Sequence, residues 1–267
     1  MRSCGPPRKT IKPMKITVCT CTYNRPQMLG YLLWCFERQT YEDRELIVLD
    51  DAGQLLPTRG DNWQIFSVDE RCPTLGAKRN ALARLVPTSS DAIAIWDDDD
   101  LYMPWALEAT CAALEKAPWS RPSLALTPSM GALRPLRTYT QPDRSDRAYQ
   151  GGWGYRTEAF WRVAGYPPDI SVGEDIELAR RFIGHGIADA DPIVLGHTPF
   201  YVWGPWSNLH LGALSYADWP RRAPTGQPIR IEPRQPAVRL QKTAITGAPL
   251  PRPWQGNWLT DYPIEKE

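Results

Sequence analysis

Four consecutive aspartates, Asp97 to Asp100, directly follow the apolar run Ala-Ile-Ala-Ile-Trp at residues 92–96. The run has the length and isoleucine content of a buried strand and is too short for a stable helix. Four like charges at the end of a buried strand are costly unless a cation neutralises them. Clustered carboxylates suit Mg²⁺ or Mn²⁺, which keep open positions for water or substrate phosphates. A solvated acidic loop is the simpler alternative. Ligand sites in open α/β sheets lie beyond the carboxyl ends of strands, and this position favours a metal–phosphate site.

Strand and helix patterns alternate through the first half of the chain. We expect strands at residues 15–21, 45–49, 63–68 and 92–96. We expect helices to begin at Pro26, to run from 75 to about 86 after a capping Thr74, and to run from 104 to about 116. This alternation predicts a mostly parallel sheet with helices on both faces, and right-handed crossovers place the carboxyl ends of its strands at one edge.

Polar side chains follow three of these expected strands. That edge of the sheet therefore collects residues 22–24 (Thr-Tyr-Asn), the pair Asp50–Asp51 and the acidic run. The second half of the chain is less regular. It contains possible strands at residues 124–127 and 133–139 and possible helices at 157–164 and 174–184.

The composition narrows the class of protein. A formal net charge of +1 over 267 residues gives no general attraction to nucleic acid or to anionic membranes. Residues 1–13 are polar, basic and interrupted by proline, unlike a signal peptide, and no apolar stretch approaches the ~20 residues that span a bilayer. We therefore expect a cytoplasmic protein with no integral membrane segment, whose six cysteines are free thiols.

Five segments, in this order along the chain, resemble family 2 glycosyltransferases. They are Ile-Thr-Val-Cys-Thr-Cys-Thr-Tyr-Asn-Arg-Pro at 16–26, Gln-Thr-Tyr at 39–41 followed by Glu-Leu-Ile-Val-Leu-Asp-Asp at 45–51, Gly-Ala-Lys-Arg-Asn at 76–80, the acidic run, and Gly-Glu-Asp-Ile-Glu-Leu-Ala-Arg at 173–180. The resemblance extends roughly from residue 15 to residue 210, which is most of the chain. It implies a GT-A fold, a Rossmann-like α/β architecture, and an enzyme that uses a nucleotide sugar.

The resemblance also implies a donor site at the first two strand ends. Thr22, Tyr23 and Asn24 would border the nucleotide, with the Tyr23 ring stacked on the nucleobase, and Asp51 would accept a hydrogen bond from a base N–H. Asp50 is expected to orient the loop. Arg79, near a helix start, would reach the diphosphate, although a surface arginine is the alternative.

Within the acidic run, Asp97 and Asp99 fit the D-x-D spacing of the family and would ligate Mn²⁺ or Mg²⁺. Strand alternation would point both side chains the same way, with Asp99 as the first choice for direct ligation. Asp98 would contact ribose or sugar. The register is ambiguous, because Asp98 and Asp100 have the same spacing.

Asp175 is the expected catalytic base. It lies at a helix start, where backbone amides and the helix dipole favour the ionised carboxylate, and it would accept the proton of an acceptor hydroxyl. A single displacement of this kind inverts the anomeric configuration. The alternative is that Glu174 and Asp175 are ordinary first-turn acids.

Two further groups of residues are candidates by resemblance. His210 would lie near the metal and diphosphate, although it could equally be a surface or core residue. In the glycine-rich segment 151–155, Trp153 offers an apolar face for sugar stacking. Trp203 and Trp206 would line the acceptor side, although a tryptophan is more often a core residue.

These observations predict three regions. Residues 1–14 form a flexible segment, 15–215 a GT-A catalytic domain (15–103 the nucleotide-binding half, 104–215 the acceptor half), and 216–267 a Pro/Arg-rich extension. We expect transfer of a single sugar from a nucleoside-diphosphate donor, UDP-linked by preference, to a saccharide, lipid-linked or protein acceptor. A nucleotidyltransferase is an alternative that lacks its usual glycine-rich phosphate loop here, and a non-catalytic carbohydrate-binding protein is another that leaves the clustered acids unexplained.

Overall fold

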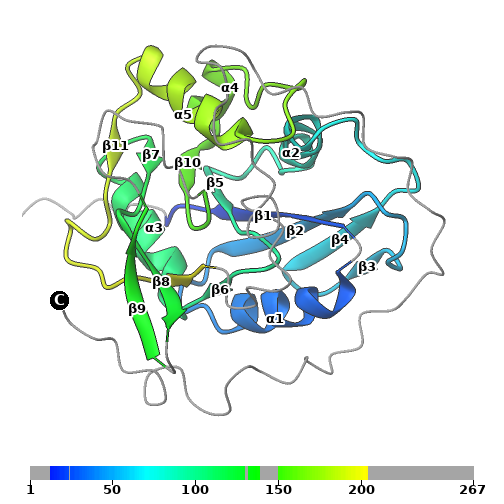
Figure 1. The fold of residues 1–267 in the computed structure, drawn as a ribbon, viewed down its shortest axis with the longest axis horizontal. Coiled ribbons are helices and arrows are strands. Elements are labelled where there is room, and N and C mark those ends of the chain that lie inside the picture. The colour runs from blue at the N-terminus through cyan, green and yellow to red at the C-terminus, as the bar shows by residue number, and fades with distance from the viewer. Residues whose placement is uncertain (1–12, 24, 130–131, 139–149, 204–267) are drawn as a thin grey trace, which may run out of the picture.

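The computed structural model describes residues 13–23, 25–129, 132–138 and 150–203 (Figure 1). The predictions for most of residues 1–14, for the extension at 216–267, and for Asn24, Trp206 and His210 lie outside these described residues. Within the described part, no helix has the length and apolar character needed to cross a membrane.

The helices and strands alternate along the first half of the chain, as predicted. The helices are α1 (Pro26–Glu37), α2 (Leu75–Arg84), α3 (Ala106–Leu114), α4 (Thr157–Arg162) and α5 (Glu174–Gly184). The larger sheet is ordered β11 (Asp189–Ala190), β7 (Trp119–Ser120), β10 (Gly154–Arg156), β5 (Ala92–Ile95), β1 (Ile16–Thr22), β2 (Arg44–Asp50), β4 (Trp63–Ser67), β3 (Thr58–Arg59). A smaller sheet is ordered β6 (Leu101–Tyr102), β12 (Tyr201–Val202), β8 (Leu124–Ser129), β9 (Ala132–Arg137).

The centre of the larger sheet is parallel. Strand β1 pairs in parallel with both β2 and β5, and β2 pairs in parallel with β4, whereas β10 and β3 are antiparallel to their neighbours. The chain therefore proceeds outward from β1 in one direction through β2 and β4, then returns to add β5 on the other side. In open α/β sheets, the carboxyl ends of the strands at such a reversal mark the ligand site.

Each face of the sheet has its own apolar core. Ile16 and Val18 of β1 pack on the face covered by α1 and α3, whereas Ile93 and Ile95 of β5 pack on the face covered by α2, α4 and α5. In Figure 1, α1 lies on one side of the sheet and α2, α4 and α5 lie on the other. Burial on both faces explains why β5 is continuously apolar and why even the threonines of β1 are buried.

The short strands were not predicted. Strands β3, β6, β7, β11 and β12 contain two residues each, too few to show the two-residue periodicity of a half-buried strand. Strand β10 was not predicted either: it overlaps the end of the glycine-rich segment 151–155 and pairs between β5 and β7 in the larger sheet.

Candidate active site

The four aspartates form a turn at the carboxyl end of β5, rather than an extension of the strand. Strand β5 ends at Ile95, and the backbone N–H of Asp100 donates to the carbonyl of Asp97 at 3.3 Å. Strand alternation therefore does not apply to the acidic turn (residues 97–100). The expectation that Asp97 and Asp99 point the same way is wrong, because their carboxylates pair with different arginines.

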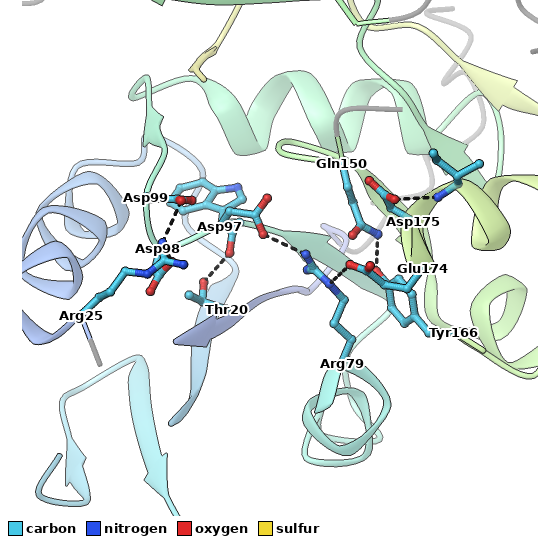
Figure 2. Close-up of polar contacts among 12 residues, drawn as sticks. Thr20, Arg25, Arg79, Asp97, Asp98, Asp99, Gln150, Tyr166, Glu174 and Asp175 are labelled. Carbon is cyan, nitrogen blue, oxygen red and sulfur yellow. Dashed lines mark hydrogen bonds and ion pairs between the residues drawn. The ribbon is translucent and has the colours of Figure 1, made fainter. Parts of the chain in front are cut away.

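Asp98 and Asp99 converge on Arg25, the residue immediately before α1. One terminal nitrogen of Arg25 lies 3.1 Å from Oδ1 of Asp98 and 2.8 Å from Oδ2 of Asp99 (Figure 2). The hydroxyl of Thr22, at the end of β1, donates to Oδ2 of Asp98 at 2.7 Å. Burial raises the pKa of the Asp98 carboxyl to about 7, even though Arg25 and Thr22 both favour its charged form.

Arg79 of α2 connects the acidic turn to the start of α5. Its terminal nitrogen lies 3.0 Å from Oδ1 of Asp97, and its Nε lies 3.2 Å from Oε1 of Glu174. Figure 2 shows the guanidinium between these two carboxylates. Burial alone would lower the pKa of the guanidinium, but the negative charges around it, that of Asp97 foremost, raise the pKa well above its ordinary value. Arg79 is thus a buried bridge rather than a surface arginine.

Asp175 lies beside Glu174 in the first turn of α5. The amide of Ile176 donates to its Oδ1 at 2.7 Å. That hydrogen bond favours the ionised form, yet burial and the neighbouring Glu174 outweigh it and raise the pKa of Asp175 to about 7. The helix start therefore does not keep this carboxylate fully ionised at neutral pH, in contrast to the sequence-based expectation. A carboxylate with a pKa near the working pH is well suited to general base catalysis.

The start of α2 is fixed to the segment that leads into α5. The side chain of Asn80 exchanges two hydrogen bonds with the backbone of Tyr166, at 2.8 and 2.9 Å. The amide of Gly76 donates to the carbonyl of Ile170 at 2.9 Å. A Cβ atom at position 76 would lie 2.0 Å from the carbonyl oxygen of Pro167, so only glycine permits this approach. These contacts hold Asp175 in place relative to the sheet.

Asp50 and Asp51, at the end of β2, have separate roles. The carboxylate of Asp50 accepts hydrogen bonds from the amides of Ala52, Gln54 and Leu55 and from the hydroxyl of Ser67, so it orients the loop as predicted. The carboxylate of Asp51 is fully buried. It pairs with the ammonium group of Lys78 and accepts from the amide of Cys72 at 3.1 Å.

Tyr23 follows the end of β1, as predicted, and one face of its ring is covered. The guanidinium carbon of Arg71 lies 3.4 Å from the centre of the Tyr23 ring. The ring is therefore surface-accessible only in part, and it already takes part in a stacking contact with a planar group. The predicted nucleobase would use the same type of contact.

Trp153 does not present an apolar face for sugar stacking, and that prediction is corrected. Its side chain is 1% exposed and packs edge-on against Trp119, with ring centres 5.0 Å apart. The preceding glycines serve packing: a Cβ atom at Gly151 would lie 2.6 Å from a carboxylate oxygen of Asp100, and one at Gly152 would lie 2.9 Å from the ring of Tyr201.

Three residues of the site were not assigned by sequence reasoning. Arg25 and Lys78 lie inside the segments that carry the family resemblance, and this position could have marked them as site residues. Their ion-pair partners are 27 to 74 residues away, so the local sequence gives no indication of these contacts. Gln150 had no local signal. Its amide nitrogen donates to the hydroxyl of Tyr166, and its carbonyl oxygen is buried with no hydrogen-bond partner among the described residues.

The donor set fits a hard divalent cation that is also held by substrate phosphates. No three acidic, histidine or cysteine side chains within the described ranges are arranged to hold a metal ion by themselves. Mg²⁺ needs only one or two protein carboxylates when phosphates and waters complete its shell. The carboxylates of Asp98 and Asp99, which already share one cationic partner, supply such a pair.

Known proteins are similar to part of this sequence and to its fold. Residues 17–120, from β1 to β7, match the family model described as glycosyl transferase family 2. A glycosyltransferase of Bacillus subtilis, YwdF, described as uncharacterized, is 29% identical over 109 residues, which cover 39% of this chain and 40% of that protein. The chain thus spans well under half the length of this curated relative.

Solved structures extend the likeness beyond the family match. The structure of residues 1–349 of TarS from S. aureus has a TM-score of 0.54 at 15% identity, covering 73% of this chain and 62% of that one. The same region of TarS in complex with UDP-GlcNAc has a TM-score of 0.52 at 14% identity, covering 71% of this chain and 58% of that one.

The parallel sheet, its doubly covered faces and the acidic turn at the end of β5 define a GT-A fold, as expected from the sequence. Over residues 17–120 the chain is similar to family 2 of the glycosyltransferases.

Proposed function

We propose that the chain is a metal-dependent, inverting glycosyltransferase that moves one sugar from a UDP-linked donor to an acceptor hydroxyl. The match of residues 17–120 to the glycosyl transferase family 2 model supports transfer from a nucleotide sugar. The shared fold of TarS, whose structures include complexes with UDP and UDP-GlcNAc, supports uridine as the nucleoside.

The bridge formed by Arg79 is the observation that carries this proposal. It brings the acidic turn after β5 and the first turn of α5 to opposite sides of one guanidinium. A transferase needs a group that holds the donor phosphates and a base that faces the sugar. Asp98 and Asp99 on one side and Asp175 on the other provide these two groups at the sheet edge where α/β proteins bind ligands.

The nucleotide would bind along the ends of β1 and β2. The Tyr23 ring would stack on the base, and Thr22 would border the ribose. Asp51 is fully buried in its pair with Lys78, so it would accept a base N–H only once that pair opens.

We place Mn²⁺ or Mg²⁺ on Asp98 and Asp99, which share Arg25, in place of the Asp97 and Asp99 pair expected from the D-x-D spacing. Asp97 and Arg79 would lie beside them. When bound, the cation supplies charge neutralisation for the diphosphate of the leaving nucleotide.

Asp175 would act on the acceptor. Its carboxylate takes the proton of the acceptor hydroxyl while the hydroxyl oxygen forms a bond to the anomeric carbon, and the bond from that carbon to the diphosphate oxygen breaks. Attack occurs opposite the leaving group, so the configuration inverts. The raised pKa of Asp175 suits this role because proton transfer is most effective when the pKa of the base is close to the working pH.

Calorimetric titration of the full chain with UDP, GDP and dTDP, each with and without Mn²⁺, tests the proposal. We expect UDP to bind with Mn²⁺ present and to bind much more weakly without it. Metal-dependent binding of GDP or dTDP, rather than of UDP, would show that the donor carries a different nucleoside. Binding of no nucleotide would contradict the transferase proposal and favour a non-catalytic carbohydrate-binding protein.

A further inference from the structure

Arg25 places its guanidinium against two carboxylates of the acidic turn. It is the residue before α1, and its side chain makes no capping hydrogen bond to that helix. Instead it reaches across the sheet edge to Asp98 and Asp99, which lie 73 and 74 residues further along the chain. The sequence thus places a fixed positive charge at the acidic turn.

The contact is made through a single atom. Arginine commonly binds a carboxylate through two parallel hydrogen bonds. Here one terminal nitrogen contacts one oxygen of each carboxylate, at 3.1 and 2.8 Å. Two carboxylates that share one positive centre are arranged as two carboxylates that coordinate one metal ion.

Burial explains why a cation is needed there before any ligand arrives. The Asp98 and Asp99 residues are 4% and 6% exposed, and they are adjacent in the sequence. Two neighbouring buried carboxylates without a counter-ion would be strongly destabilised. Arg25 is itself mostly enclosed, with a side chain that is 19% exposed, so its guanidinium is held close to them.

We propose that Arg25 is an internal counter-ion that occupies the cation position of Asp98 and Asp99 in the ligand-free protein, and that the divalent cation must displace it to bind. This inference rests on the proposed role of the acidic turn. The displaced guanidinium then becomes available to the donor diphosphate, a group that arginine binds well. Binding of the nucleotide and binding of the metal therefore favour each other. The diphosphate holds the guanidinium away from the carboxylates, and the metal on the carboxylates leaves the guanidinium available to the diphosphate.

The test is the affinity of the full chain for Mn²⁺ without nucleotide, measured by the electron paramagnetic resonance signal of free Mn²⁺. Arg25→Gln removes the competing charge, and we expect its affinity to be about ten-fold higher than that of the wild type, equivalent to about 1.4 kcal/mol. Arg25→Lys retains a cation and should stay within about three-fold of the wild type. Arg38→Gln is the matched control: it removes the same charge just after α1, at an exposed side chain that stacks on Trp34.

An unchanged or lower Mn²⁺ affinity of folded Arg25→Gln would overturn the inference. A second measurement uses the wild type and so does not depend on the folding of the Gln variant. The ¹⁵N resonance of the Arg25 guanidinium, assigned through Arg25→Lys, should shift when Mg²⁺ is added. No shift at saturating Mg²⁺ would also overturn the inference.

The outcomes separate this inference from the proposed function. Mn²⁺-dependent UDP binding by the wild type, without a gain for Arg25→Gln, would leave the transferase proposal in place and remove the counter-ion. A gain for Arg25→Gln in a protein that binds no nucleotide would establish the counter-ion and contradict the transferase proposal.

Discussion

Arg79 of α2 and Glu174, the first residue of α5, form a buried ion pair in which Nε lies 3.2 Å from Oε1, although 95 residues separate them. The second contact of Arg79, with Asp97, joins this pair to the acidic turn. One side chain thus sets the position of α5, and with it Asp175, relative to the end of β5. The geometry of the candidate active site depends on this link.

Arg79→Met should destabilise the fold and abolish transfer. The substitution leaves Glu174 buried without its counter-charge, a change that typically costs about 3–5 kcal/mol in the free energy of unfolding. Denaturant unfolding measures the loss. Arg84→Gln, at an exposed position of the same helix, should change stability by less than about 0.5 kcal/mol. Adding Glu174→Gln to Arg79→Met should recover part of the loss, and strict additivity of the two changes would contradict the coupling.

Gly76→Ala and Gly30→Ala should have opposite effects on stability, although both lie within helices. At position 76 the new Cβ would meet the carbonyl oxygen of Pro167 at 2.0 Å, so the segment leading to α5 must shift, at a cost of about 1–3 kcal/mol. At position 30 the new Cβ would have no atom within 4 Å apart from those of neighbouring residues and the backbone of α1, and alanine should stabilise α1 by about 1 kcal/mol. Thermal unfolding of both variants is the measurement. A stable Gly76→Ala variant would show that this contact does not fix α5.

Local sequence patterns were sufficient to predict the central strands and the helices. Apolar runs such as the one ending at Trp96, and the start signals Pro26 and Thr74, act within a few residues, and the structure confirms them; the hydroxyl of Thr74 caps α2 by accepting from the amide of Ala77 at 2.9 Å. The two-residue strands depend on partners elsewhere in the chain, so no local period could reveal them.

The candidate site was predictable as a set of segments, but not as a set of contacts. The acidic run was found from its composition, and the first turn of α5 was found from the resemblance of residues 173–180 to a family 2 motif. Which carboxylate faces which arginine depends on tertiary packing: Asp97 faces Arg79, whereas Asp99 faces Arg25. The burial of Trp153 could not be predicted for the same reason. A tryptophan flanked by glycines occurs both in cores and at surfaces, and the local sequence does not distinguish the two.

Asp99→Asn should weaken the Mn²⁺-dependent binding of UDP. The amide replaces a charged oxygen donor with a neutral one, and we expect a loss of at least about ten-fold, since even outer partners of metal sites cause losses of that size. Calorimetry with and without Mn²⁺ isolates the metal-dependent part. Asp61→Asn removes an exposed acid between β3 and β4 and should have no effect. An unchanged Mn²⁺-dependent affinity for UDP would count against Asp99 as a ligand.

Asp175→Asn should retain donor binding and lose transfer. An asparagine cannot accept the hydroxyl proton, and general base catalysis typically contributes about 10²–10⁴-fold to the rate. Calorimetry with UDP and Mn²⁺ measures binding, and release of UDP in the presence of acceptor measures transfer. Glu177→Gln, in the same turn of α5, is the matched control and should remain active. Full activity of Asp175→Asn would exclude it as the base.

The pH dependence of transfer at saturating donor and Mn²⁺, where the cation would keep Asp98 ionised, provides a further test of Asp175. Only the ionised carboxylate can accept a proton, and burial together with the charge of Glu174 raises the pKa of Asp175 to about 7. The rate should therefore rise as pH increases through about 7 and level off above it, in the wild type and in Glu177→Gln alike. An ordinary aspartate, with a pKa of about 3.9, would give a flat profile from about pH 5.5 upward.

The raised pKa of Asp175 also affects stability. Between about pH 4 and 7 the folded protein binds a proton at this carboxylate more readily than the unfolded chain does, so the contribution of Asp175 to stability falls as pH rises. Asp175→Asn removes that contribution, and its stability relative to the wild type should increase across the same interval, as urea unfolding at pH 5 and pH 8 would measure.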